Sequence, residues 1–138
     1  EDSPTGPSFP GGSASTQYDG VWVADFGVGD YPVRGLRFEV QQGAFVHAYM
    51  DSFWDILSCS PPSFSNTRFD PVPGPILIVS DELSTTGAMV TLPLTIDQLY
   101  VSFTSSMKAT GSLVVSLDAG GPCVLDNASP RPFVATKQ

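Results

Sequence analysis

The amino-acid sequence predicts an all-β protein, a single antiparallel β-sandwich or small barrel of about eight strands with little or no helix. Short segments in which apolar and polar residues alternate recur along the chain, and they are separated by Gly, Pro, Asn and Asp, the residues that favour turns. No segment has the apolar repeat of a long amphipathic helix. The 138 residues give room for one domain with a substantial core.

The first two strands are expected where aromatic and aliphatic residues alternate with other residues. Residues 18–26 form the first strand, with Trp22 facing inward. The segment GVGDYP that follows has the composition of a turn. Residues 33–41 form the second strand, with apolar side chains at alternate positions on one face. These are Leu36, Phe38 and Val40.

A tight turn at Gln42-Gly43 leads to a third strand over 44–50. Strict alternation sends its side chains in two sets to opposite faces. The two sets are Phe45, His47 and Tyr49, and Val46, Ala48 and Met50. The next segment, DSFWDIL over 51–57, suits either a continued strand or a short helical turn.

Residues 58–75 form the longest irregular segment, which holds Cys59 and five prolines. A loop of this length in a small domain is usually functional or held in place by a further constraint. More strands are expected after it, and in the third of them Leu99, Val101 and Phe103 face inward. Their ranges are 75–80, 88–94, 98–104, 110–117, 123–125 and 132–136.

The two cysteines, Cys59 and Cys123, are far apart in the sequence. Neither has a second Cys or a His at the spacing of a zinc or redox motif. The pair fits one long-range disulfide, which would hold the irregular segment. A disulfide indicates an oxidising, extracytoplasmic compartment.

Several short motifs resemble those of small secreted all-β domains of bacteria. They comprise an Asp-Gly-x-Trp opening strand, Phe-x-Val in the second strand, a Cys after the third strand, a late Gly-Ser-Leu strand, a Pro-Cys and a closing aromatic-x-Ala-Thr-Lys. The matching residues are Gly20, Trp22, Phe38, Val40, Cys59, Gly111, Cys123 and 133–137, and the resemblance covers residues 18–137. It implies the all-β fold and the disulfide. It implies no activity, and it carries over no site residue.

The chain is acidic, with a formal net charge of −8 and six basic residues. So few cations cannot neutralise many phosphates, which argues against nucleic acid as a partner. The same charge disfavours docking on anionic lipid. No stretch approaches the ~18 apolar residues of a membrane span.

Residues 1–17 are rich in Pro, Gly and Ser, so we expect a flexible or extended arm ahead of a β-domain over 18–138. The chain starts at Glu1 with a polar segment and no apolar signal region. We therefore expect the mature form of an exported protein after signal-peptide removal, located in the periplasm, at the cell surface or outside the cell.

The sequence offers little catalytic chemistry. His47 is the only histidine, and in the middle of a strand it is more typical of a packed or surface side chain than of a catalytic or metal site. The carboxylates fall mostly at turns, where Asp bonds to the local backbone. The Asp25–Asp30 and Asp51–Asp55 pairs lack the pattern of an EF-hand. We therefore expect no enzyme, no metal and no cofactor.

Exposed aromatic residues are the best candidates for contacts with a partner. Trp54 lies in the irregular region beside two aspartates, and Phe9 is the only large apolar residue of the arm. The full set of candidate contacts is Phe9, Trp54, Phe64 and Phe69. Trp, Tyr and Phe are enriched at protein interfaces.

Together these features predict a non-catalytic structural or accessory subunit of an extracytoplasmic assembly, bound to other protein subunits through the arm and the region 54–69. The main alternative is a carbohydrate- or surface-binding module that stacks sugar rings on aromatic side chains. A glycosidase-type enzyme with paired aspartates is less favoured.

Overall fold

The computed structural model describes residues 16–27, 33–53, 63–85, 87–92, 94–118, 124–125 and 130–138. Within these ranges all regular structure is β-strand, and no helix is present. Every strand pairing in them is antiparallel. The predicted all-β antiparallel class is therefore confirmed. The cysteines and residues 1–15 of the expected arm lie outside the described residues.

The strands follow one another from near the start of the described chain to its end. They are β1 (Gly20–Asp25), β2 (Val33–Gln41), β3 (Ala44–Phe53), β4 (Ser63–Phe69), β5 (Ile76–Leu77), β6 (Glu82–Ser84), β7 (Met89–Thr91), β8 (Leu94–Phe103), β9 (Lys108–Asp118), β10 (Val124–Leu125) and β11 (Arg131–Lys137).

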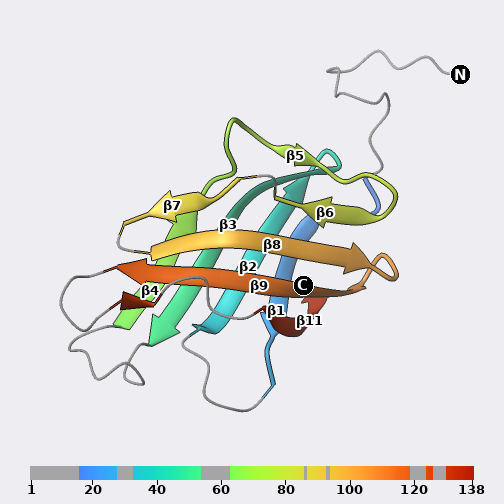
Figure 1. Cartoon of the computed structure of the whole chain (residues 1–138). Coiled ribbons are helices and arrows are strands. Elements are labelled where there is room, and N and C mark those ends of the chain that lie inside the picture. Colours follow the sequence, from blue (N-terminus) through green and yellow to red (C-terminus); the bar gives the residue numbers. More distant parts are fainter. Residues whose placement is uncertain are drawn as a thin grey trace, which may run out of the picture.

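All of these strands belong to one continuous sheet, in the order β4-β3-β2-β1-β11-β9-β8-β6 (Figure 1). The short strands β5, β7 and β10 pair at its margins with β3, β8 and β9. The sheet is not closed into a barrel, because its two ends, β4 and β6, are not paired with each other. There are more strands than expected, since two- and three-residue strands leave no periodic signal in the sequence.

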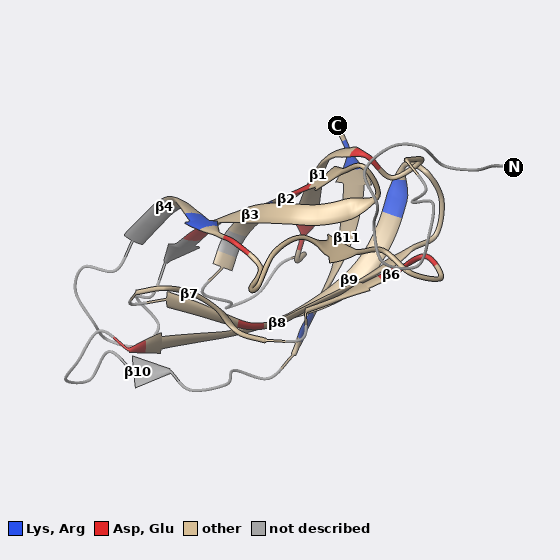
Figure 2. Ribbon diagram, turned by 90° about the horizontal axis from the view of Figure 1, so that it is seen from above, with Lys and Arg blue, Asp and Glu red and all other residues tan. Residues whose placement is uncertain are grey.

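The sheet folds over into two layers. In Figure 1, β7, β8 and β9 cross in front of β1 to β4. Seen from above, β11 lies between the two layers at one end, beside β1 (Figure 2). Contacts between β4 and β7 join the layers on another side, where the Thr91 hydroxyl donates to the Arg68 carbonyl. The core therefore lies between two halves of one sheet.

Aromatic side chains fill the centre of this core. The rings of Trp22 and Phe38 stack with centroids 6.1 Å apart, and Phe103 meets Trp22 edge-on at 5.0 Å. These three residues were expected in the core, and all are buried. The inward-facing set predicted for β8, with Leu99 and Val101, is also confirmed.

A bulge in β3 changes the alternation of its side chains. Glu39 pairs with His47, but the neighbouring Val40 pairs with Phe45, so Val46 has no counterpart on β2. One extra residue in a strand shifts every later side chain to the other face.

Beyond the bulge, Ala48 and Met50 point into the core, as does Phe45 before it. His47 and Tyr49 are half-buried and lie on the outer face. The prediction that Phe45 shares a face with His47 and Tyr49 was therefore wrong. A prediction based on strict alternation does not detect an inserted residue.

The segment expected to be irregular contains strand β4. It pairs with β3, whose last residues continue the strand as far as Phe53. Ser, Asn and Pro in this region gave no strand signal, so pairing with the edge of β3 overrides the local propensity. Residues 54–57 of the ambiguous segment lie outside the described residues.

Asp19, the first residue of the Asp-Gly-x-Trp motif, holds the β2–β3 turn. Its two carboxylate oxygens accept hydrogen bonds from the backbone N–H groups of Gln42 and Gly43, each at 2.9 Å. Both turn residues have positive φ, 55° and 75°, as a tight hairpin with right-handed twist requires. This motif residue therefore has a structural role.

Candidate functional site

Two depressions on the surface bring side chains together from several strands. The larger, the aromatic groove, has a volume of about 700 Å³. Its lining residues are Asp25, Phe26, Gly27, Tyr100, Thr110, Gly111, Ser112, Pro132, Phe133 and Val134. The smaller, the polar pocket, has a volume of about 190 Å³. Its lining residues are Val23, Gly35, Leu36, Arg37, Tyr49, Asp51 and Asn66.

Behind the aromatic groove, the ring of Phe133 lies over Gly111 and belongs to the core, with only 4% of the residue exposed. The two residues are paired across β11 and β9. A Cβ atom at Gly111 would lie 2.6 Å from Phe133 Cζ and 2.2 Å from the Tyr100 carbonyl oxygen. Only glycine leaves room for the ring at this position. Phe26, just after β1, packs edge-on against Phe133 with centroids 5.5 Å apart.

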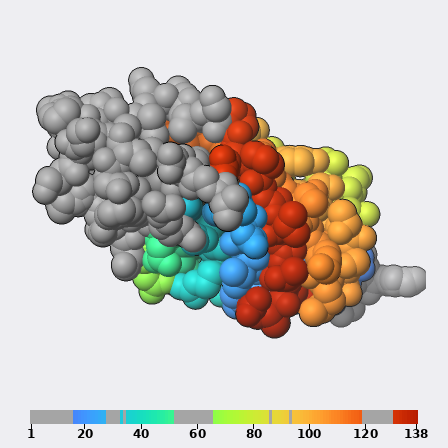
Figure 3. All heavy atoms as spheres, turned by 90° about the horizontal axis from the view of Figure 1, so that it is seen from below, coloured from blue at the N-terminus to red at the C-terminus, as the bar shows by residue number. Residues whose placement is uncertain are grey.

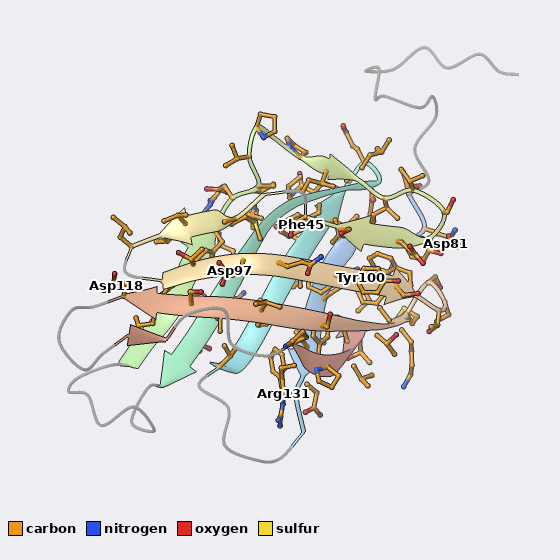
Figure 4. All side chains as sticks on the ribbon, in the orientation of Figure 1. Phe45, Asp81, Asp97, Tyr100, Asp118 and Arg131 are labelled. Atoms are coloured by element: carbon orange, nitrogen blue, oxygen red, sulfur yellow. The ribbon has the colours of Figure 1, made fainter. Side chains whose placement is uncertain are left out.

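The rim of the groove is partly apolar and partly polar. Pro132 and Val134 are exposed, and half of the Val134 surface is open to solvent. Tyr100 lines the groove from β8, on the layer that faces the viewer in Figure 4. A hydrogen bond to the Glu82 carboxylate and partial burial raise the pKa of Tyr100. The Tyr100 hydroxyl is therefore protonated at neutral pH and points its proton toward Glu82.

The groove owes its position to the order of strands in the sheet. β1, β11 and β9 lie side by side on the face seen in Figure 3. Asp25 accepts a hydrogen bond from the Gly27 backbone at 2.8 Å, and Gly27 has a φ of 77°. This turn places Phe26 against β11. The result is an open, mainly apolar channel across strands that are distant in the sequence.

The polar pocket lies on the outer face of β2, β3 and β4. The Arg37 guanidinium lies 4.9 Å from the centroid of the Tyr49 ring and donates a hydrogen bond to Asn66 Oδ1. The Asn66 backbone N–H donates to Asp51 Oδ1 at 2.6 Å. Asn66 has a φ of 54°, a conformation that Asn tolerates better than most residues.

Register shifts flank the polar pocket on two neighbouring strands. One lies between Val33 and Gly35 on β2, and the other between Met50 and Ser52 on β3. A Cβ atom at Gly35 would come within 3.3 Å of Asp51 Oδ2. Bulges of this kind redirect side chains and often lie near functional sites.

His47 lies beside the polar pocket and is paired with a carboxylate. Its Nε2 is 2.8 Å from Glu39 Oε1, and its ring meets Tyr49 edge-on at 5.2 Å. It is a half-buried strand histidine, as expected. Nowhere in the described ranges do three or more His, Cys, Asp or Glu side chains gather as metal ligands would.

The residues singled out in the sequence fall elsewhere. Phe9, Trp54, Cys59 and Cys123 lie outside the described residues, and of Phe64 only the backbone, in β4, is described. Phe69 is fully buried in the core, which corrects the expectation that it contacts a partner, because it presents no surface.

Sequence reasoning did not single out Phe26, Tyr100 or Phe133 as contact residues. They line one groove only because β1, β11, β9 and β8 are neighbours, an order that the sequence does not reveal. The one available signal was Gly111, since a glycine inside a strand often marks a close approach of another group.

No protein-family model, curated protein or solved structure matches this chain. In the described ranges, no helix is long and apolar enough to cross a membrane.

Proposed function

We propose that this protein is a non-catalytic accessory subunit of an extracytoplasmic assembly, and that it binds an extended segment of a partner protein in the aromatic groove. The observation that carries the proposal is the open, mainly apolar channel lined by Phe26, Tyr100 and Val134. Aromatic-lined grooves hold extended, proline-rich peptide segments, because aromatic rings pack against apolar side chains while rim groups bond to the peptide backbone.

The rim chemistry suits such a segment. Tyr100, Thr110 and Ser112 lie on neighbouring positions of β8 and β9 and carry hydroxyl groups that can bond to a peptide backbone. Asp25 adds a carboxylate at one end. With a net charge of −8 on the whole chain, the partner segment is expected to be apolar with basic flanking residues.

The non-catalytic part of the proposal is supported by what the described carboxylates do. Asp19 holds the hairpin turn, Asp81 accepts a 2.7 Å hydrogen bond from the Tyr18 hydroxyl, and Asp70 pairs with Arg68 at 3.0 Å. Each of these three carboxylates therefore makes a contact that serves the fold.

The proposed export of the protein depends on a disulfide between Cys59 and Cys123, because disulfides persist in oxidising, extracytoplasmic compartments. Cys59 belongs to the connection between β3 and β4, and Cys123 immediately precedes β10. Such a bridge would stabilise the fold by about 4 kcal/mol on chain-entropy reasoning.

Native purification of two variants from the source tests the docking function. Val134→Glu places a charge on the groove rim, whereas Val90→Glu places the same charge on β7, at another exposed valine. We expect stoichiometric partner proteins with the wild type and the β7 variant, and their loss with Val134→Glu. A wild-type chain that purifies without companions would contradict the proposal.

A further inference from the structure

Beyond this docking function, we propose that the polar pocket on the outer face of β2, β3 and β4 is a binding site for a neutral sugar residue. Arg37, Asp51 and Asn66 would bond to its hydroxyl groups, and the Tyr49 side chain would pack beside its ring. The proposal rests on residues that take no part in the aromatic groove.

The pocket presents hydrogen-bond donors and an acceptor side by side. Arg37 has several N–H donors, Asn66 has an amide group, and Tyr49 has a hydroxyl. Asp51 has two carboxylate oxygens, of which Oδ1 accepts from the Asn66 backbone. A sugar hydroxyl both donates and accepts, so neighbouring hydroxyls can bond to a guanidinium and a carboxylate at once.

The mixed charge of the pocket argues against a simple ion as its ligand. A small anion would be attracted by Arg37 and repelled by Asp51. A metal cation would be attracted by Asp51 and repelled by Arg37. Arg37 and Asp51 are both exposed, so water screens their attraction for a charged ligand. A neutral ligand rich in hydroxyl groups does not meet this conflict.

The shape of the pocket fits one ring and not a large molecule. Its volume of about 190 Å³ is below the ~300–1,000 Å³ typical of sites for drug-sized ligands. Gly35 and Val23 leave an apolar wall beside the polar groups. Such a wall can pack against the C–H face of a sugar.

The polar groups are held in place before any ligand binds. Arg37 is oriented by the Tyr49 ring and by Asn66 Oδ1, and Asn66 is held by Asp51. In the described part of the chain, the guanidinium of Arg37 forms no ion pair with a carboxylate. The Tyr49 ring and Asn66 Oδ1, which contact it among the described residues, are neutral, so the charged guanidinium is a strong hydrogen-bond donor. Fixed side chains lose little entropy on binding.

An array of neutral oligosaccharides probed with the full-length protein tests this proposal, followed by titration of the best ligand. Tyr49→Ala and Gly35→Ala are the test variants. The second removes no polar group but places a methyl 3.3 Å from Asp51 Oδ2. Val90→Ser, on β7 and outside both depressions, is the matched control. Near-ultraviolet circular dichroism establishes that each variant is folded.

We expect binding of at least one neutral oligosaccharide, a loss of affinity on the order of tenfold in both pocket variants and no change in Val90→Ser. No binding across the array would overturn the proposal, as would equal affinities in all variants. Competition by inorganic phosphate, calcium or free alanine at millimolar concentration would assign the pocket to an ion or a zwitterion instead. None of these outcomes bears on the aromatic groove, because its partner is a protein.

Discussion

The ammonium group of Lys137 lies 5.8 Å from the centroid of the Trp22 indole ring. The same Nζ donates hydrogen bonds to the carbonyl oxygens of Gln17 at 2.8 Å and Asp19 at 3.1 Å. One side chain of the last strand therefore ties the end of the described chain to its beginning. Gly20 leaves room for it, since a Cβ atom there would lie 2.7 Å from Lys137 Cδ.

Replacement of Lys137 by Met is expected to lower the free energy of unfolding by about 1–2 kcal/mol, because the charge and its two hydrogen bonds are lost while the apolar stem is kept. Lys108→Met is the control, since Lys108 is exposed and its removal should cost less than about 0.5 kcal/mol. Urea unfolding of both variants measures the difference. Equal effects would show that Lys137 is not a structural link.

Gly111→Ala is expected to destabilise the protein by about 1–3 kcal/mol, because the new methyl would overlap the Tyr100 carbonyl and the Phe133 ring. Gly87→Ala is the matched control, because nothing lies within 4 Å of a Cβ atom there. Thermal unfolding compares the two variants. A Gly111→Ala protein as stable as the control would mean that Phe133 does not lie over Gly111.

Asp19→Ala removes the acceptor for two turn N–H groups and should lower the free energy of unfolding by about 1–2 kcal/mol. The effect should be local first, so the amide protons of Gln42 and Gly43 should exchange faster with solvent than in the wild type. Hydrogen exchange followed by NMR measures this. Unchanged exchange at both amides would contradict the role assigned to Asp19.

The stability of the protein should fall at alkaline pH partly through Tyr18. The hydrogen bond to Asp81, followed by burial and the charge of that carboxylate, raises the pKa of Tyr18 above its usual value of 10.0. A raised pKa in the folded state stabilises the fold while the phenol is protonated, fully below the unfolded pKa. This stabilisation is lost as the pH rises through the folded pKa.

Tyr18→Phe should therefore be less stable than the wild type at pH 8 and should lose less stability between pH 9 and 11. Denaturant unfolding across this range, with the wild type in parallel, measures the two slopes. Parallel curves would show that the Tyr18–Asp81 bond is not coupled to folding.

The sequence was most informative where strands are regular. Alternation in 33–41 and 98–104 identified the buried faces of β2 and β8 correctly, with Phe38 and Phe103 in the core. The alternation did not predict the bulge at Val46, because no particular residue type marks an inserted position in a strand. It also failed at β4, because that strand depends on the edge of β3.

The two depressions could not be predicted from the sequence, for a related reason. Each combines residues from strands that are neighbours only in space, such as Phe26 with Phe133, or Arg37 with Asn66. The meeting of Tyr49 and Asp51 with Arg37 requires the register of β2, β3 and β4. Strand order is set by long-range packing, and bulges shift the register of β2, β3 and β4 at positions that the local pattern does not mark.

Photo-crosslinking in the source organism tests the central claim most directly. A benzophenone amino acid is placed at position 134 on the rim of the aromatic groove, and at position 90 on β7 as the control. The docking function predicts that one defined partner protein is crosslinked from position 134 and not from position 90, through a single extended segment identified by mass spectrometry. The absence of any adduct from position 134, or the same adducts from both positions, would contradict it.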